Sequence, residues 1–600
     1  MPENEVAPDI RPFLEVRSAI PSNFSPDATK VLIQSNLSGT AQLYTVPREG
    51  GPLTRITSFD DPVSGTYLPT TDDIVISMAS GGNERTQLSL MPDSGTDVLP
   101  LVDDPDHIYR VGGVTRDGTA LAYASNARNG TDFDISVLPL DGSDPRIVFG
   151  RGGWCQARGF SPDGRWLSVA RLTERSGDND LYLVDISTGE ILEIAPHTDA
   201  AYVGAPAWFA DASAFYFATD VDRDTSAIAT FDLETRAWHY VLEREEDTGC
   251  VMNWPGTALL VTSSRDGYTD ATLVNPRTLE PVRPIGLPSH GVADFAFSRD
   301  GRYLAYSFTS PVQPSDAWCY DIETGDNARL TESPCAVDLS SLVEPVVERV
   351  TSFDGEHLAL FVYRPPGGSR SNAPVVVYLH GGPESQHTPE FNPLIAWLVG
   401  RGYAVVAPNV RGSTGYGKRF EHLDDGRRRG HAIADLGCIH EWIRGQSQLD
   451  ERRCALMGGS YGGYLAVAGL AFQPERWRAG VSLVGISSLT TFLEHTAEWR
   501  RSLREAEYGS LERDRDFLDA ASPLTRADQI RAPLLIIHGA NDPRVPVEEA
   551  QQIHETVRAH GGRSELLVYE DEGHGLTRLA NRLDAYPKAA AFLEEALGVV

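Results

Sequence analysis

Positive charge is scarce in this chain, and lysine in particular is nearly absent. Of its 600 residues, 52 are lysine or arginine and 84 are aspartate or glutamate, which gives a formal net charge of -32. Lysine occurs only at Lys30, Lys418 and Lys588. Nucleic acids and anionic membranes bind to basic protein faces, so we expect neither as a partner of this protein.

Long apolar runs and paired cysteines are missing too. No stretch reaches the roughly 18 apolar residues of a membrane span, and the acidic start Met1 to Val6 lacks the apolar core of a signal peptide. The six cysteines are scattered, with no CxxC and no short Cys/His cluster, as is typical of reduced thiols. We therefore expect a cytoplasmic protein with no cofactor and no metal site.

The first half of the chain repeats a short pattern, in which an apolar residue and a Ser/Thr-x-Asp-Gly turn precede an alternating strand. The spacing is about 45 residues, the blade period of a β-propeller. Turns of this composition suit the sharp reversal between strands. The repeats begin at Phe24, Val114, Phe160, Phe209 and Phe297, with weaker copies at Pro69 and Trp254.

These seven copies predict a propeller of about seven blades over residues 18–337, preceded by a lead segment, residues 1–17, without the blade pattern. A propeller alone is often only a platform for other proteins. The paired Glu245 and Glu246 are most simply a solvated turn.

A different pattern follows in residues 338–600. Continuous apolar runs alternate with helical segments, as in a mostly parallel sheet covered on both faces. The expected strands are 374–379, 403–407, 454–457, 479–484, 534–537 and 566–569, after a hairpin over 346–363; the expected helices are 393–400, 432–444, 547–560 and 586–597. We predict an α/β-hydrolase domain, so the fold class is an all-β propeller followed by an α/β unit.

The apolar run at 454–457 leads into Gly458-Gly459-Ser460-Tyr461-Gly462. A Gly-x-Ser-x-Gly segment between a strand and a helix is the sequence form of a nucleophile elbow. The glycines allow the strained turn and the close approach of neighbouring backbone. Ser460 is therefore the candidate nucleophile.

A serine hydroxyl needs a histidine to accept its proton and an acid to orient that histidine. In α/β-hydrolases these follow the serine in the order Asp, then His. Asp542 lies just after the strand 534–537, and His574 lies between two glycines after the strand 566–569. We predict these two as the partners of Ser460. Of their neighbours, Asp571 and Glu572 are expected to be solvated loop charges and His538 to have a structural role.

An oxyanion hole needs hydrogen-bond donors aimed at the developing alkoxide. The backbone N–H of Tyr461, directly after the nucleophile, is one candidate. The second candidate is the N–H of Gly382 in His380-Gly381-Gly382-Pro383, and the hydroxyl of Tyr416 is the alternative donor.

Taken together, these motifs resemble the prolyl oligopeptidase family of serine peptidases. The resemblance covers nearly the whole chain and rests on His-Gly-Gly-Pro, Arg-Gly-Ser-Thr-Gly-Tyr-Gly, Gly-Gly-Ser-Tyr-Gly-Gly, Asn-Asp-Pro-Arg-Val-Pro and Glu-Gly-His-Gly. The acylaminoacyl-peptidase branch looks most similar. By this resemblance Ser460, Asp542 and His574 match the family's triad, Tyr416 its oxyanion tyrosine, and Gly382 and Tyr461 the backbone donors of that branch. The Asp-Trp-x-Tyr-Glu-Glu segment of dipeptidyl peptidases is absent.

The resemblance implies a serine peptidase that cleaves short peptides, N-acylated ones included, with a propeller that restricts access. Within 486–508, Phe492, Trp499 and Tyr508 are candidates for an apolar S1 pocket, although such aromatic residues are more often core. Two alternatives stay open: a carboxylesterase with the same triad, and a non-catalytic propeller scaffold. The sequence leaves the P1 preference and the oligomeric state open, a homo-oligomer included.

Overall fold

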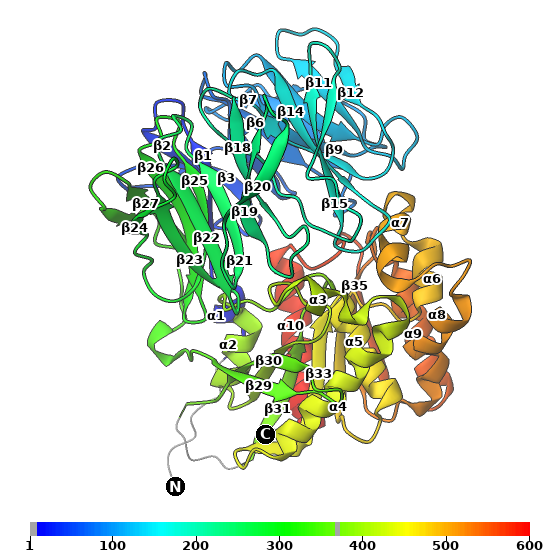
Figure 1. Cartoon of the computed structure of the whole chain (residues 1–600). Helices are drawn as coiled ribbons and strands as arrows, with labels where there is room; N and C mark the ends of the chain where they lie inside the picture. The colour runs from blue at the N-terminus through cyan, green and yellow to red at the C-terminus, as the bar shows by residue number, and fades with distance from the viewer. Residues whose placement is uncertain (1–8, 367–371, 600) are drawn as a thin grey trace.

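The structure is a computed structural model that describes residues 9–366 and 372–599. It contains two units, one above the other (Figure 1). The upper unit in Figure 1 consists of β-sheets, and the lower unit is a sheet flanked by helices. Among the described residues, no helix is both long and apolar enough to cross a bilayer.

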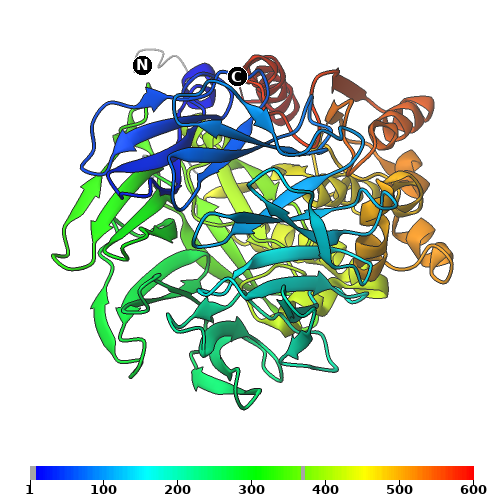
Figure 2. The same cartoon turned by 90° about the horizontal axis from the view of Figure 1, so that it is seen from above.

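The upper unit is a seven-bladed propeller. Within the described chain, strands β1 to β28 form seven four-stranded antiparallel sheets, each built from four consecutive strands, which confirms the predicted seven blades. The blades follow one another around a ring, from blue through cyan to green in Figure 2. Blade by blade, the strands are Ala19–Phe24, Lys30–Ser35, Gln42–Pro47 and Thr54–Arg55 (β1 to β4); Val63–Tyr67, Asp73–Met78, Gln87–Pro92 and Leu99–Pro100 (β5 to β8); Tyr109–Val114, Ala120–Ser125, Asp134–Pro139 and Arg146–Phe149 (β9 to β12); Cys155–Phe160, Trp166–Leu172, Asn179–Asp185 and Ile191–Ile194 (β13 to β16); Ala207–Trp208, Ala214–Thr219, Ala227–Asp232 and Ala237–Leu242 (β17 to β20); Asp247–Met252, Leu259–Arg265, Tyr268–Val274 and Pro281–Pro284 (β21 to β24); and Val292–Phe297, Tyr303–Ser310, Gln313–Asp321 and Asn327–Arg329 (β25 to β28).

The repeated turn has a local physical cause. In four blades the Ser or Thr hydroxyl donates to the Asp carboxylate two residues later, over 2.7 Å from Ser25, 2.6 Å from Thr115 and 2.5 Å from Ser161 and Ser298. The same carboxylate accepts a backbone N–H two residues further on, for example that of Thr119 at 3.0 Å. The turn therefore folds from its own side chains, which is why the sequence repeats it.

The ring closes by side-chain packing between the first and last blades. Ala19 and Phe24 of β1 share an apolar core with Ala305 and Cys319 of the seventh blade. Among residues 9–366 and 372–599, each blade keeps its own four strands and none is shared across the closure.

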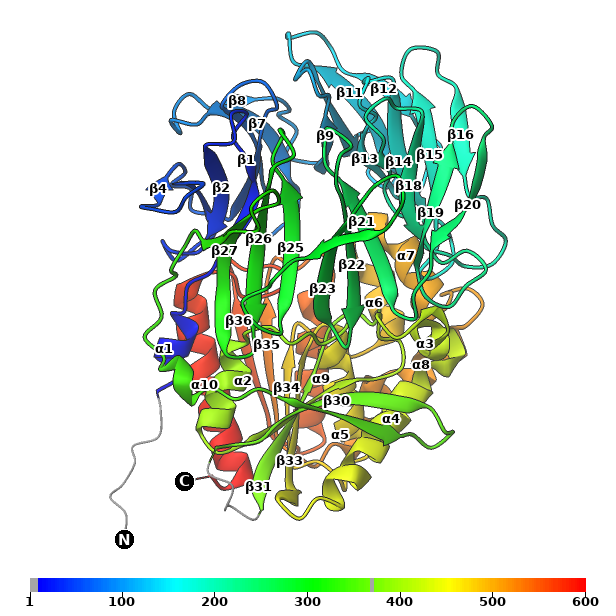
Figure 3. The same ribbon diagram turned by 60° about the vertical axis from the view of Figure 1, so that its left-hand side comes forward.

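The lower unit contains one eight-stranded sheet in the order β29-β30-β32-β31-β33-β34-β35-β36. Pairing is antiparallel for β29 with β30 and for β30 with β32, and parallel from β32 onward. Figure 3 shows this sheet beneath the blades. Its strands are Val346–Thr351 (β29), His357–Tyr363 (β30), Ala373–Leu379 (β31), Ala404–Asn409 (β32), Leu449–Gly459 (β33), Ala479–Leu483 (β34), Leu534–Gly539 (β35) and Ser564–Tyr569 (β36).

Helices cover both faces of this sheet, as its apolar strands require. Along β31, Val375 and Val377 belong to one core and Val376 to the other. Helices α4, α5 and α9 contribute to the first core, and α1, α2 and α10 to the second. The helices are Arg11–Leu14 (α1), Pro393–Gly400 (α2), Lys418–Glu421 (α3), Arg429–Arg444 (α4), Tyr461–Phe472 (α5), Leu489–His495 (α6), Glu498–Tyr508 (α7), Arg515–Ala521 (α8), Val547–Ala559 (α9) and Leu579–Leu597 (α10).

The lead segment packs on the lower unit. Phe13 and Leu14 of α1 are buried in the core that contains α2 and α10. Residues 1–8 of the predicted lead segment lie outside the described residues.

Candidate active site

Ser460 lies in a strained turn between β33 and α5. Its backbone has φ 55° and ψ -117°, a conformation that non-glycine residues rarely adopt. Gly462 allows this turn, because a Cβ there would come within 2.2 Å of the Leu379 carbonyl oxygen. The strain presents the serine side chain at the carboxyl end of the parallel strands.

Three side chains form a hydrogen-bonded chain at this point. His574 Nε2 lies 3.0 Å from Ser460 Oγ, and His574 Nδ1 lies 2.7 Å from Asp542 Oδ2. Asp542 follows β35 and His574 follows β36, so three separate loops meet at the same sheet edge. In this arrangement the histidine can take the serine proton while the carboxylate fixes its tautomer.

The Asp542 carboxylate is itself held by its own loop. Its Oδ1 accepts the backbone N–H groups of Arg544 at 2.8 Å and Val545 at 3.0 Å. The nearby His538 is buried and donates from Nε2 to the Val545 carbonyl at 2.8 Å. Burial lowers the pKa of His538, so the ring is neutral and supports the loop.

Glu572 is not the solvated loop charge that we expected. It is only 1% exposed, and its Oε2 accepts from the backbone N–H of Thr577 at 3.0 Å and from its hydroxyl at 2.9 Å. Oε1 accepts from the backbone of Arg578 at 2.9 Å. These bonds connect the His574 loop to the start of α10. They also compensate the free-energy cost of burying the Glu572 carboxylate.

The two backbone donor candidates flank Ser460. Tyr461 is the first residue of α5, so its N–H has no acceptor within the helix. The loop of Gly381 and Gly382 runs directly past the elbow, because a Cβ on Gly381 would lie 3.4 Å from Ser460 Cβ. Gly382 has φ 130°, a conformation that favours glycine.

Tyr416 has a partner of its own. Its hydroxyl accepts a hydrogen bond of 2.8 Å from Asn409 Nδ2, and its ring lies 5.6 Å from that of Phe420. Burial raises the pKa of this hydroxyl, so it stays protonated and able to donate. Its role as the alternative oxyanion donor stays a prediction.

The candidate pocket residues Phe492 and Trp499 have other packing partners. Phe492 is 3% exposed in the hydrolase core and meets the ring of Tyr508 edge-on at 5.6 Å. Trp499 lies against the propeller, 5.1 Å from Trp154 and 6.2 Å from Phe133. A part in substrate binding stays a prediction for both residues.

The second blade of the propeller contacts the loops of Asp542 and His574. Asn541 Nδ2 donates to the Gly81 carbonyl at 3.0 Å, and Arg544 Nε lies 2.5 Å from Glu84 Oε1. A Cβ on Gly82 would come within 2.4 Å of the Gly573 nitrogen. The propeller therefore lies directly over the candidate catalytic loops.

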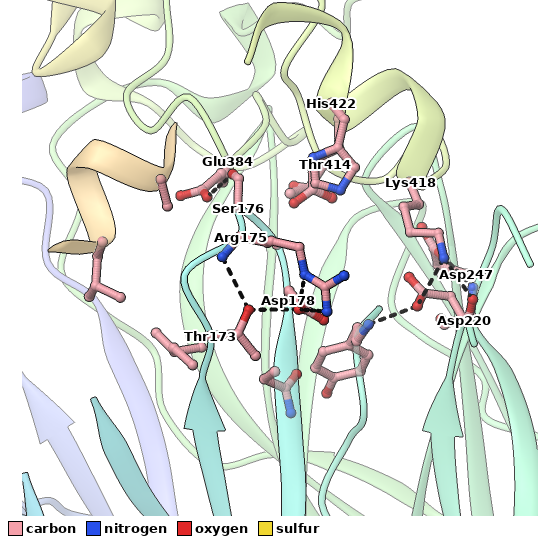
Figure 4. A pocket seen from close by; sticks show the side chains of 18 of the residues that line it. Thr173, Arg175, Ser176, Asp178, Asp220, Asp247, Glu384, Thr414, Lys418 and His422 are labelled. Atoms are coloured by element: carbon pink, nitrogen blue, oxygen red, sulfur yellow. Dashed lines mark hydrogen bonds and ion pairs between the residues drawn. The ribbon is translucent and has the colours of Figure 1, made fainter. Parts of the chain in front are cut away.

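A cavity of about 420 Å³ lies between the fourth, fifth and sixth blades and the hydrolase loops. Figure 4 shows Ser176 and Arg175 of the propeller opposite Glu384, Thr414 and His422. Ser176 Oγ lies 2.6 Å from Glu384 Oε1, and Glu384 follows the Gly382 loop by two residues. The cavity thus borders the loop that passes Ser460.

A buried ionic cluster beside the elbow was not predicted from the sequence. Arg429 is completely buried and pairs with Asp424 and Glu507. The only sequence signal is the run Asp424-Asp425-Gly426-Arg427-Arg428-Arg429, and such a run is usually a solvated surface. Burial raises the pKa of Asp424 to about 8, because the loss of hydration exceeds the attraction of Arg429.

Comparison with known proteins agrees with the fold of the two units. Residues 389–600 match the prolyl oligopeptidase family, and residues 152–333 match the N-terminal β-propeller domain of prolyl oligopeptidase. Dipeptidyl aminopeptidase BIII of Pseudoxanthomonas mexicana is 28% identical over 96% of this chain and 86% of its own length. Acylamino-acid-releasing enzyme of Rattus norvegicus is 28% identical over 41% of this chain and 34% of its own length. A prolyl endopeptidase structure has the same fold, with a TM-score of 0.86 and 20% identity over 98% of this chain and 91% of that one. This chain therefore belongs to the prolyl oligopeptidase family and is a serine peptidase.

Proposed function

We propose that Ser460 is the nucleophile of this peptidase, His574 its general base and Asp542 the residue that orients the histidine. The observation that carries the proposal is the hydrogen-bonded chain from Asp542 through His574 to Ser460, with distances of 2.7 and 3.0 Å. Ser460 Oγ attacks the substrate carbonyl while His574 Nε2 takes its proton. His574 then gives the proton to the leaving amine, and water hydrolyses the acyl-enzyme by the same route.

The backbone N–H groups of Tyr461 and Gly382 stabilise the oxyanion in this proposal. Helix α5 begins at Tyr461, so its N-terminal partial positive charge also faces the developing negative charge. Only the backbone of these two residues is involved, which makes the hole independent of their side chains.

The substrates are short peptides, N-acylated ones included. The propeller contacts beside Asp542 and His574 support restricted access. Among the relatives, one is an acylamino-acid-releasing enzyme and another a dipeptidyl aminopeptidase, so both blocked and free peptides belong in the substrate panel.

The test combines active-site labelling with that panel. A fluorophosphonate probe is expected to label Ser460, and Ser460→Ala is expected to abolish both labelling and hydrolysis of acyl-peptides and free peptides. Ser487, which also lies in the hydrolase unit but bonds to Glu549, provides the control variant Ser487→Ala. Undiminished labelling of Ser460→Ala would contradict the assignment. Hydrolysis of p-nitrophenyl esters without any peptide hydrolysis would instead favour an esterase.

A further inference from the structure

Helix α7 presents two arginines, one turn apart, to the space between the propeller and the hydrolase unit. Arg504 lines the cavity described above and pairs with Glu384 Oε2 at 3.1 Å. Arg500 differs, because its guanidinium has no hydrogen-bond acceptor and no carboxylate partner among residues 9–366 and 372–599. Its Nε is buried without a partner.

A second unpaired arginine approaches from the propeller. Arg110 lies on β9, with its guanidinium carbon 4.4 Å from the ring centre of Trp154 and 5.8 Å from that of Trp499. The guanidinium carbon of Arg500 lies 5.1 Å from the same Trp499 ring. Two cations from different units thus share one indole, and in the described chain neither has a carboxylate of its own.

The local charge balance is strongly positive. Glu84 is the carboxylate whose charge acts on both Arg110 and Arg500, but its Oε1 already pairs with Arg544 at 2.5 Å. Three guanidinium groups therefore face one carboxylate. Burial, with the neighbouring Arg544 and Arg504, lowers the pKa of Arg500 to about 10, so Arg500 remains charged at neutral pH.

Arg500 is also close to the candidate catalytic loop. Just before it, the Ala497 N–H donates to the Pro543 carbonyl at 3.1 Å, and the Thr496 hydroxyl donates to the Arg544 carbonyl at 2.8 Å. Both acceptors lie within two residues of Asp542. A ligand group at Arg500 would thus be held by the helix whose two preceding residues are bonded to this loop.

We propose that Arg500, with Arg110 beside it, binds a carboxylate of the peptide substrate. The inference rests on the proposed function and names a feature of its substrates. Arg500 is half-buried, and burying part of a guanidinium without a counter-ion is costly. Its planar fork matches a carboxylate. In a chain with a net charge of -32, this local excess of cations selects acidic ligands that the rest of the surface repels.

Two sources could supply the carboxylate: an acidic side chain or the C-terminus of a short peptide. Three peptides separate them: acetyl-Ala-Glu-Ala-amide, acetyl-Ala-Gln-Ala-amide and acetyl-Ala-Gln-Ala with a free C-terminus. Their affinities for the Ser460→Ala protein are measured by calorimetry, so that the result does not depend on turnover. We expect one or both acidic peptides to bind about 10- to 100-fold more tightly than the neutral peptide, as for a charge-assisted hydrogen bond.

The second variant is Ser460→Ala with Arg500→Gln. Because the Arg500 guanidinium forms no hydrogen bond with the described protein, this change should leave the fold intact, which circular dichroism checks. The preference for the acidic peptide should fall to about twofold or less, within ordinary mutational scatter, while affinity for the neutral peptide stays the same. Arg515→Gln, which removes an exposed arginine paired with Glu494, is the matched control and should keep the preference.

Equal affinities for all three peptides in the Ser460→Ala protein would overturn the proposal. A preference that survives Arg500→Gln would overturn it as well. The catalytic assignment is tested separately by labelling of Ser460. If that assignment is wrong, the binding result can still be interpreted. If Arg500 recognises only a peptide carbonyl, the Glu and Gln peptides will weaken equally in the variant, which also contradicts the proposal.

Discussion

The Tyr461 hydroxyl donates a hydrogen bond of 2.9 Å to Asp424 Oδ2, and both residues are completely buried. The Arg429 guanidinium pairs with the same carboxylate and lies 5.0 Å from the Tyr461 ring centre. The residue after the candidate nucleophile is thus held by its side chain in an ionic cluster, while its backbone N–H remains at the helix start. In the proposed mechanism, structural support and oxyanion stabilisation therefore come from different parts of one residue.

This separation predicts the effect of Tyr461→Phe. The change removes one hydrogen-bond donor to the buried Asp424 side chain, which should lower the free energy of unfolding by about 1–3 kcal/mol. The backbone N–H is unchanged, so kcat should fall by less than about tenfold. Thermal unfolding and steady-state kinetics provide the two measurements. Tyr464→Phe, which removes a bond of 2.9 Å to the Ala521 carbonyl, is the control; a much larger loss of kcat in Tyr461→Phe would contradict the backbone role.

The raised pKa of Asp424 predicts a pH dependence of stability. Its pKa is about 8 in the folded protein against an ordinary value of 3.8. Between pH 3.8 and 8, the folded state therefore binds this proton more tightly than the unfolded state does. The stability that this proton contributes is complete below about pH 4 and is lost as the pH rises towards 8, with a slope of at most about 1.4 kcal/mol per pH unit. Asp424→Asn should therefore show a shallower fall in unfolding temperature between pH 5 and 8 than the unchanged protein. Parallel curves would show that Asp424 does not hold this proton.

Much of the fold could be predicted because its signals are local. The Ser25 and Thr115 turns fold through contacts within a few residues, so each blade carries its own signature. The same holds for Ser460, because the glycines that allow its strained turn lie within two residues of it in the sequence. Where the cause of a structure lies within a few residues, the sequence displays it.

The missed features depend on contacts between distant segments. The run around Arg429 reads as a solvated surface, but Glu507, 78 residues further along the chain, completes a buried cluster. Helix α10 begins at Leu579, seven positions before the predicted start at Tyr586, because it continues past Pro587. Packing of α10 on the sheet compensates the hydrogen bond that proline removes, and no local pattern predicts that compensation.

Access to the site gives a third prediction. The second blade bonds to the loops around Asp542 and His574, and Arg578 pairs with Asp61 at 2.9 Å. A polypeptide too large to pass these contacts should not reach Ser460. We expect the intact chain to cleave short peptides and to leave casein in the same reaction uncut. Mass spectrometry measures the cleavage of the peptides, and gel electrophoresis measures that of casein. Rapid digestion of casein, abolished by Ser460→Ala, would show that the propeller does not restrict access.

The last prediction concerns the second donor of the oxyanion hole. Gly382 and Tyr416 are the alternatives, and the proposal favours the Gly382 backbone because its loop runs against Ser460. Tyr416→Phe should then lower kcat by less than about tenfold, because the change would remove only the acceptor of a 2.8 Å bond from Asn409 and no bond to the oxyanion.

Gly382→Ala tests the other candidate donor, the backbone N–H of residue 382. A Cβ at Gly382 would lie 2.8 Å from the Glu384 nitrogen, at a φ of 130° that disfavours alanine, so the loop must shift and move the N–H. Loss of one oxyanion donor costs about 10²–10³ in kcat with little change in KM, and we expect a fall of that size for Gly382→Ala. Steady-state kinetics on one short peptide measures both variants, with circular dichroism as the check on folding. If Tyr416→Phe instead lowers kcat a hundredfold while Gly382→Ala retains activity, the tyrosine hydroxyl is the donor and the backbone assignment is wrong.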